Sequence, residues 1–152
     1  MQDTVLNSIV TGVYVLTASH QGKINGSTMT WVTPVSYDPL LVMVSMADIR
    51  VSHGMVKQSG HFGLNVLSGD QLELARHFGF KSGRDTDKFE GIEYSTSENG
   101  LPVLKDACAY IECRVVNTYP AGDHTLFVGE VIEARTIKES VKPLIFDQKD
   151  FY

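Results

Sequence analysis

Residues 107–137, ACAYIECRVVNTYPAGDHTLFVGEVIEARTI, carry the clearest structural signal in this chain. Ile111, Cys113 and Val115 alternate with charged residues, and residues 125–137 are rich in β-branched and aromatic side chains. Alternation of this kind predicts a strand with one face in a core. Between the two halves, residues 119–123 contain a proline and a glycine and predict a turn. The stretch therefore predicts a long antiparallel β-hairpin.

The segments before this hairpin predict further strands and few helices. Strands are expected at residues 13–17, 23–33, 40–46 and 61–67, and short helices at 3–10, 51–59 and 71–79. Gly60 and Gly79 are expected to end the last two helices, and Ser68 with Gln71 matches a capping box. Residues 80–100 predict a long polar loop. Because the strands follow one another without alternating helices, we expect an antiparallel barrel or sandwich with helices at its ends.

Composition predicts one globular domain over residues 1–152 and excludes several protein classes. Hydrophobic residues make up 43% of the chain, which is ordinary for a globular protein. The formal net charge is −5, which argues against a general nucleic-acid binder. The longest apolar runs span five residues, whereas a membrane-spanning helix needs roughly twenty. The first residues show no secretory signal, so a cytoplasmic protein is expected.

The sequence carries none of the common catalytic or metal-binding motifs. It has no GxGxxG, P-loop, GxSxG, HExxH or CxxC pattern, and its five histidines lack metal-ligand spacing. We therefore expect no metal site. Cys108 and Cys113 lie five residues apart in a predicted strand, which is too far for a disulfide, so both are expected to be free.

Residues 25–31, NGSTMTW, place small and hydroxyl-bearing side chains in the middle of a predicted strand. Such residues leave room for a flat ligand against the backbone, whose N–H and C=O groups could bond its polar edge. The alternative is a strand whose Ser and Thr side chains face water.

Residues 48–53, DIRVSH, precede and open a predicted helix. A helix N-terminus favours a phosphate group, and Arg50, Ser52 and His53 would add donors. The alternative is ordinary helix capping by Asp48 or Ser52.

Residues 76–88 concentrate basic side chains in an otherwise acidic chain. A phosphorylated cofactor needs such a local cluster, although Asp85 and Asp87 also fit a solvated loop. The basic side chains are Arg76, His77, Lys81, Arg84 and Lys88.

Taken in order, these segments resemble the flavin reductase-like, FMN-binding split-barrel family. The resemblance covers roughly residues 5–137. Within the family the chain is most similar to the ferric reductase and flavoredoxin type, and it also resembles the flavin domain of high-molecular-weight rubredoxins. Its most specific part is GDHTLFVGE at residues 122–130. The other segments that carry it are GVYVLT at 12–17, NGSTMT at 25–30, Ser45-Met46, Ser52-His53, SGHFGLNVL at 59–67, FGF at 78–80 and DKF at 87–89.

The resemblance implies a six-stranded Greek-key split barrel with two or three short helices, commonly a homodimer with its flavin near the subunit interface. It implies FMN, or sometimes FAD, and NADH or NADPH as the electron donor. His124 would lie near the nicotinamide, and Ser52 and His53 would hold the phosphate with Lys81, Arg84 or Lys88. The flavin ring and ribityl chain would contact Ser27, Thr28, Met29, Thr30, Ser45, Met46 and Ala47.

The function that this implies is an NAD(P)H-dependent flavin reductase that passes electrons to free flavin, ferric iron or a redox protein. The reaction requires two flat rings in contact, which fits the absence of a catalytic triad. Two alternatives stay open: a non-catalytic FMN-binding electron carrier reduced by a partner protein, and a β-barrel that binds another ligand. Trp31 is a large side chain beside the expected flavin edge and would either stack there or limit access.

Overall fold

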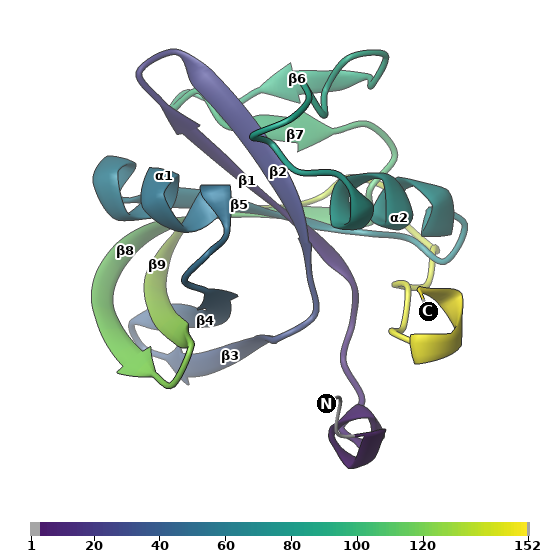
Figure 1. Ribbon diagram of the computed structural model, residues 1–152, viewed down its shortest axis with the longest axis horizontal. Helices are drawn as coiled ribbons and strands as arrows, with labels where there is room; N and C mark the ends of the chain where they lie inside the picture. The colour runs from purple at the N-terminus through teal and green to yellow at the C-terminus, as the bar shows by residue number, and fades with distance from the viewer. Residues whose placement is uncertain (1–3, 152) are drawn as a thin grey trace.

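The computed structural model describes residues 4–151, and its centre is an antiparallel sheet of seven strands (Figure 1). The strand order is β2, β1, β5, β8, β9, β4, β3. A smaller sheet pairs β6 with β7. The mostly β, antiparallel fold expected from the sequence is confirmed. The strands are β1 (Tyr14–His20), β2 (Lys23–Met29), β3 (Val32–Tyr37), β4 (Leu40–Ala47), β5 (His61–Val66), β6 (Tyr94–Thr96), β7 (Pro102–Leu104), β8 (Ala109–Ala121) and β9 (His124–Thr136).

The predicted hairpin forms from β8 and β9. The two strands pair from Ala109↔Thr136 to Ala121↔His124, so the turn is shorter than expected and contains only Gly122 and Asp123. Gly122 has a φ of +61°, which glycine adopts without strain. Two register shifts along the hairpin mark bulges, which increase the local bend and twist of a strand. The hairpin accordingly curls around one side of the barrel in Figure 1.

The strand predicted at residues 23–33 is two strands. β2 ends at Met29, and the Val32 N–H donates to the Thr30 carbonyl over 3.1 Å in a tight bend before β3 begins. β2 and β3 lie at opposite edges of the sheet, so the bend carries the chain across the opening between those edges. The main sheet therefore has seven strands rather than six. Residue alternation continues through the bend, so no local pattern in the sequence indicates it.

Two α-helices flank β2 on either side (Figure 1). α1 (Val51–Ser59) ends where Gly60 adopts a φ of +77°, as predicted. α2 (Leu72–Phe80) runs one residue beyond Gly79, its predicted end. Of the predicted capping box, the Ser68 N–H donates to the Gln71 side chain, whereas the Ser68 hydroxyl bonds Asp70.

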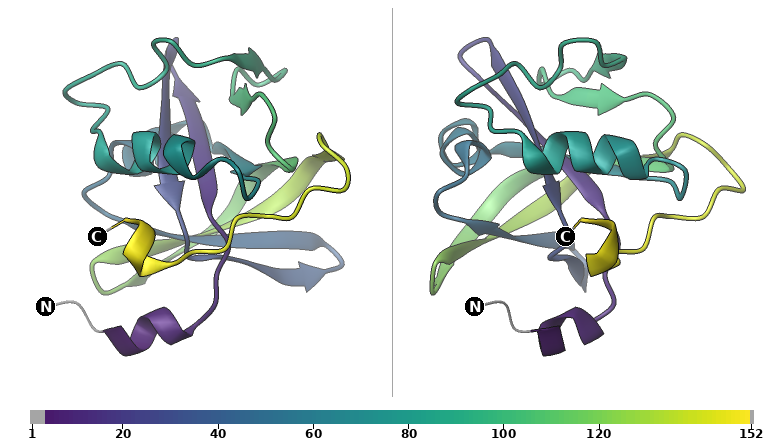
Figure 2. Two further views of the ribbon diagram at one scale, coloured as in Figure 1. Left: turned by 90° about the vertical axis from the view of Figure 1, so that its right-hand side faces the viewer. Right: turned by 45° about the vertical axis from the view of Figure 1, so that its right-hand side comes forward.

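The segments at the two ends of the described residues lie near each other in both views of Figure 2. The helix predicted at 3–10 is a short 3-10 helix, η1 (Thr4–Ser8), and residue 3 lies outside the described residues. A second 3-10 helix, η2 (Gln148–Asp150), precedes the C-terminus. The Asn7 side chain donates to the Gln148 side chain over 2.8 Å and joins the two segments.

The packing of α2 against β2 depends on a close approach at Gly26. A Cβ atom there would lie 2.9 Å from the Phe78 ring and 3.1 Å from the Phe89 ring, so a larger residue does not fit. Phe78 and Phe89 belong to a core cluster between α2 and the sheet, and a second cluster fills the barrel. Cys108 and Cys113 are both buried and free.

Candidate functional site

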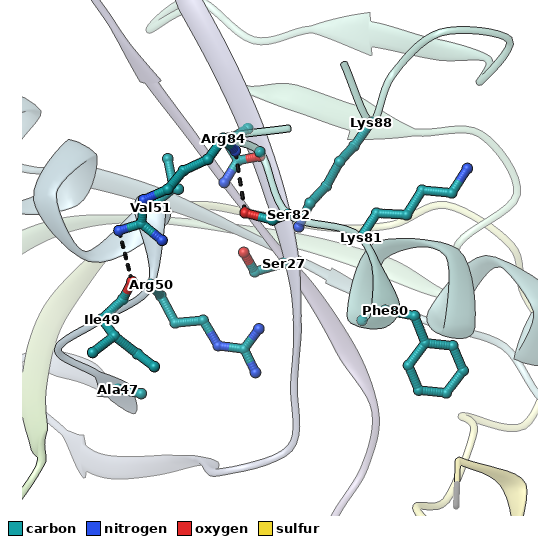
Figure 3. A pocket seen from close by; sticks show the side chains of 13 residues that line it. Ser27, Ala47, Ile49, Arg50, Val51, Phe80, Lys81, Ser82, Arg84 and Lys88 are labelled. Carbon is teal, nitrogen blue, oxygen red and sulfur yellow. Dashed lines mark hydrogen bonds between the residues drawn. The ribbon is translucent and has the colours of Figure 1, made fainter. Parts of the chain in front are cut away.

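A cavity of about 300 Å³ opens between the start of α1, strand β2 and residues 79–84 (Figure 3). Four of the chain's 13 lysines and arginines line it, and none of its lining residues is an aspartate or glutamate. The surrounding protein is acidic, with a formal charge of −5. The cavity therefore concentrates positive charge, which suits an anionic ligand. We call it the cationic cavity; its charged residues are Arg50, Lys81, Arg84 and Lys88.

Lys88 is held at the back of the cationic cavity. Its side chain is 3% exposed, and its ammonium group donates to the Gly26 carbonyl over 2.7 Å and the Phe78 carbonyl over 3.1 Å. Burial, together with the nearby charge of Arg50, lowers the pKa of Lys88 to about 8. No carboxylate from residues 4–151 pairs with this ammonium group, so a bound anion would stabilise its charged form.

Arg50 and Arg84 approach the cavity from the α1 side. Arg50 is the N-cap residue of α1, which has no side-chain cap, so the positive end of the helix faces the cavity. The Arg50 guanidinium has no hydrogen-bond partner among residues 4–151 and extends across the opening in Figure 3. The Arg84 guanidinium donates to the Ile49 carbonyl over 2.9 Å and ties the 82–85 loop to the start of α1. Lys81 lines the same cavity from an exposed position.

Ser52 lies behind the cavity and does not line it. Its side chain is completely buried, and its hydroxyl contacts the Asn25 amide nitrogen and the Ser27 hydroxyl, each at 3.0 Å. Asn25 and Ser27 themselves line the cavity. The Ser52 hydroxyl thus fixes α1 to β2 and orients two lining residues.

A second cavity of about 460 Å³ shares Arg50, Gly79 and Phe80 with the first, so the two adjoin at these residues, and the name cleft is used for both together. We call the second one the aromatic cavity. The Thr28 hydroxyl, on its β2 wall, donates to the Ala75 carbonyl over 2.6 Å. The cleft thus joins a cationic end to a slot of flat apolar side chains and hydroxyls. The other residues of the aromatic cavity are Leu6, Asn7, Ile9, Thr11, Thr28, Thr30, Trp31, Phe146 and Phe151.

The predicted flavin contacts on β2 and β4 are divided between the cleft and the core. Met29 and Met46 belong to the core of the barrel, so only their backbones are available to a ligand. Ser45 lies on the other face of β4 from Met46, and its N–H donates to the Trp31 carbonyl. Of this part of β4, Ala47 alone lines the cationic cavity.

His53 is turned away from both cavities. Its Nε2 lies 2.9 Å from the Thr125 hydroxyl and 3.3 Å from the Asp48 carboxylate, and its ring packs edge-on against Phe127. The Thr125 hydroxyl also donates to Asp48 over 2.7 Å. This cluster joins the turn before α1 to β9.

His124 begins β9, next to the bend between β2 and β3. Its Nδ1 lies 2.6 Å from an Asp123 carboxylate oxygen, and its ring packs against Trp31 with centroids 5.0 Å apart. The hydrogen bond from His124 is the main cause that lowers the pKa of Asp123. His124 therefore reaches the aromatic cavity through Trp31.

Several residues that line the cleft were not predicted from the sequence. Phe146 and Phe151 come from a tail with little pattern, and Phe80 begins a segment expected to be a loop. Gly83 also lines the cationic cavity, where a Cβ atom would lie 2.5 Å from the Asn25 amide oxygen, so only glycine fits there. Arg76 and His77 of the basic segment bond Asp150 and the Lys88 carbonyl instead of lining the cationic cavity.

Residues 4–151 contain neither a membrane-spanning helix nor a cluster of metal-binding side chains. No helix in that range is long and apolar enough to cross a membrane. No group of three or more His, Cys, Asp or Glu side chains in it is arranged to hold a metal ion.

Comparison with known proteins agrees with this geometry. The chain is 36% identical over 139 residues to a high molecular weight rubredoxin of Moorella thermoacetica, covering 90% of this chain and 61% of that protein. It is 35% identical over 131 residues to a ferric-chelate reductase (NAD(P)H) of Archaeoglobus fulgidus, covering 85% and 78%. Among solved structures, the NADH:FAD oxidoreductase SgcE6 of Streptomyces globisporus, in complex with NAD and FAD fragments, superposes with a TM-score of 0.87 at 32% identity, covering 94% and 84%. Residues 6–152 match the family described as flavin reductase like domain, and the chain belongs to this family.

Proposed function

We propose that this protein is an NAD(P)H-dependent flavin reductase that binds FMN in the cleft. The observation that carries the proposal is the joining of the cationic cavity to the aromatic cavity at Arg50 and Phe80. FMN has a charged phosphate at one end and a flat ring at the other. The two volumes, about 300 and 460 Å³, lie in the range of cofactor pockets. FAD is accommodated only if its second phosphate and adenosine leave the cleft.

Each end of the cleft has a separate task. Arg50, Lys81, Arg84 and Lys88 would hold the phosphate together with the start of α1. Ser52 would act through Asn25 and Ser27, which its hydroxyl orients. His53 would fix the turn before α1 rather than bind the phosphate.

The ring would lie along the segment from Ser27 to Thr30, with Ser45, Met46 and Ala47 contributing mainly backbone. A bound flavin supplies the chemistry, since it accepts a hydride from the dihydronicotinamide. The protein positions the two rings and keeps water from between them. We place His124 at the nicotinamide.

The electron acceptor is proposed to be free flavin, ferric iron or a redox protein. One relative is named as a ferric-chelate reductase, and the chain spans 61% of a relative named as a rubredoxin. A homodimer is proposed because Ile9 and Val10, 66% and 76% exposed, lie next to the aromatic cavity. The cytoplasmic location expected from the sequence remains a prediction.

The deciding experiment is anaerobic mixing of the FMN-loaded protein with NADH and, separately, NADPH, followed through the absorbance of oxidised flavin. Rapid bleaching supports the reductase and identifies the donor. Bound flavin without bleaching favours the non-catalytic electron carrier. Failure to bind FMN at micromolar concentration contradicts both and favours a barrel for another ligand.

A further inference from the structure

Trp31 is the only tryptophan of the chain, and it is poorly covered. It lies at the bend between β2 and β3, lines the aromatic cavity and remains 48% exposed. Large apolar side chains that stay exposed inside a cavity commonly mark a ligand contact. Thr30, its neighbour, lies on the proposed path of the flavin ring, so a second ring at Trp31 would be next to the first.

The ring of Trp31 packs against His124, at a tilt of 36°. Behind that contact, the Asp123 carboxylate lies 2.6 Å from Nδ1 of His124. A carboxylate can only accept a hydrogen bond, so a neutral His124 carries its proton on Nδ1 and presents Nε2 as an acceptor. In the described part of the chain, Nε2 of His124 has no hydrogen-bond partner. Trp31, His124 and Asp123 thus form a corner at the edge of the cleft that offers a flat apolar surface, the indole, beside one unused acceptor, Nε2 of His124.

We propose, resting on the function proposed above, that Trp31 is the stacking surface for the nicotinamide ring of the electron donor. The nicotinamide ring lies on the indole, and its carboxamide N–H donates to Nε2 of His124. This ligand matches the corner because it combines a flat ring with a pendant amide. Asp123 is a positioning residue that holds the proton of a neutral His124 on Nδ1, which leaves Nε2 as the acceptor. Trp31 therefore sets the affinity for the donor rather than for the flavin.

The test measures nucleotide binding without any reaction. FMN-loaded wild type, Trp31→Ala, Trp31→Phe and Tyr37→Ala are titrated with oxidised NAD⁺ and NADP⁺ by calorimetry. Tyr37 is the matched control, because it is an aromatic side chain 96% exposed at the far end of β3 and lines neither cavity. We expect Trp31→Ala to weaken nucleotide binding by about three- to tenfold, as the loss of one aromatic stack predicts. Trp31→Phe should retain binding within about twofold, and Tyr37→Ala should match wild type.

Two further readouts separate donor binding from a structural role. The dissociation constant of FMN, measured by equilibrium dialysis, should change by less than about twofold in Trp31→Ala. With the preferred donor, KM should rise by the factor found for the oxidised nucleotide while kcat stays near its wild-type value. A merely structural tryptophan would instead lower the melting temperature and affect FMN, KM and kcat together.

Three results would overturn the proposal. Equal nucleotide affinity in Trp31→Ala and wild type removes Trp31 from the donor site. Lost FMN affinity with unchanged nucleotide affinity assigns Trp31 to the flavin. Trp31 fluorescence that changes with protein concentration but not with nucleotide assigns it to the contact with a second copy. The function proposed above fails separately, through absent FMN binding or absent bleaching in the wild type.

Discussion

The two ends of the cleft are built in different ways. In the cationic cavity backbone carbonyls hold two of the four charged groups: the Lys88 ammonium group bonds two carbonyls, and the Arg84 guanidinium bonds a third. The aromatic cavity instead collects apolar side chains from η1, the β2–β3 bend, the end of α2 and the C-terminal tail. Directional hydrogen bonds fix a charge in place, whereas apolar contacts can readjust. We infer that the cationic cavity contributes most of the affinity for FMN. The side chains of the aromatic cavity adjust to the ring that lies against them.

Replacing Lys88 should produce the largest effect and tests whether the cationic end dominates. In Lys88→Met, FMN affinity should fall by about 10- to 100-fold, the usual cost of losing a hydrogen bond between charged groups. Riboflavin, which lacks the phosphate, should lose little affinity. The measurement is the ratio of FMN to riboflavin dissociation constants, with Lys57→Met on the last turn of α1 as the control. Equal losses for both ligands would mean that Lys88 only supports the fold.

The pH dependence of FMN binding should follow the same lysine. Because the pKa of Lys88 is about 8 without ligand and a bound phosphate raises it, binding above that pH takes up a proton. The dissociation constant should be nearly constant from pH 7 to 8 and then rise by up to about tenfold per pH unit. Titration by flavin fluorescence checks this. A Lys88→Met protein with the same rise above pH 8 would assign the effect to another group.

Whereas FMN binding should weaken above pH 8, the ligand-free protein should become more stable in the same range. Lys88 has a lower pKa when folded than when unfolded, so between about pH 8 and 10.5 the unfolded chain binds more protons. In that window the contribution of Lys88 to the free energy of unfolding rises with pH. Below pH 8 Lys88 is charged in the folded protein, and the full cost of burying that charge remains. Urea unfolding of wild type against Lys88→Met isolates this contribution. A difference between them that is independent of pH contradicts a lowered pKa.

Removing the Ser52 hydroxyl should affect stability more than binding. In Ser52→Ala, Asn25 and Ser27 lose a buried partner, which should cost about 1–3 kcal/mol of unfolding free energy. The FMN to riboflavin ratio should change by less than about threefold. Urea unfolding and dialysis measure the two effects. A large loss specific to FMN, with unchanged stability, would instead place the Ser52 hydroxyl on the phosphate.

The smallest effect on FMN affinity should come from a substitution in the aromatic cavity. Phe151 packs against Phe146 and Phe80, and Phe151→Ala leaves both of those rings in place. We expect FMN affinity to change by less than about threefold, because neighbouring side chains can close over the gap. Dialysis against Lys88→Met gives the comparison. A loss in Phe151→Ala as large as that in Lys88→Met would reverse the assignment of the two ends.

Much of the fold and part of the site were predictable because their signals are local. The β8–β9 hairpin follows from the alternation of apolar and polar residues. The end of α1 follows from Gly60, because glycine adopts a φ of +77° without strain. The basic residues of the 76–88 segment also stood out, and three of them, Lys81, Arg84 and Lys88, line the cationic cavity. The positions of Phe146 and Phe151 were not predictable, since nothing near them in the chain indicates a partner.

Local patterns in the sequence predicted most strands of the main sheet, the two α-helices and the types of residue available for a phosphate and a flat ring. Which of those residues meet depends on the folded chain. In the fold, one continuous alternating segment bends at Thr30 and Trp31, and the Ser52 hydroxyl turns inward while the Arg50 guanidinium faces the cleft. The difference lies in how far along the chain each interaction acts. Propensity, alternation and capping act within a few residues, whereas burial and hydrogen-bond pairing depend on segments that only the folded chain brings together.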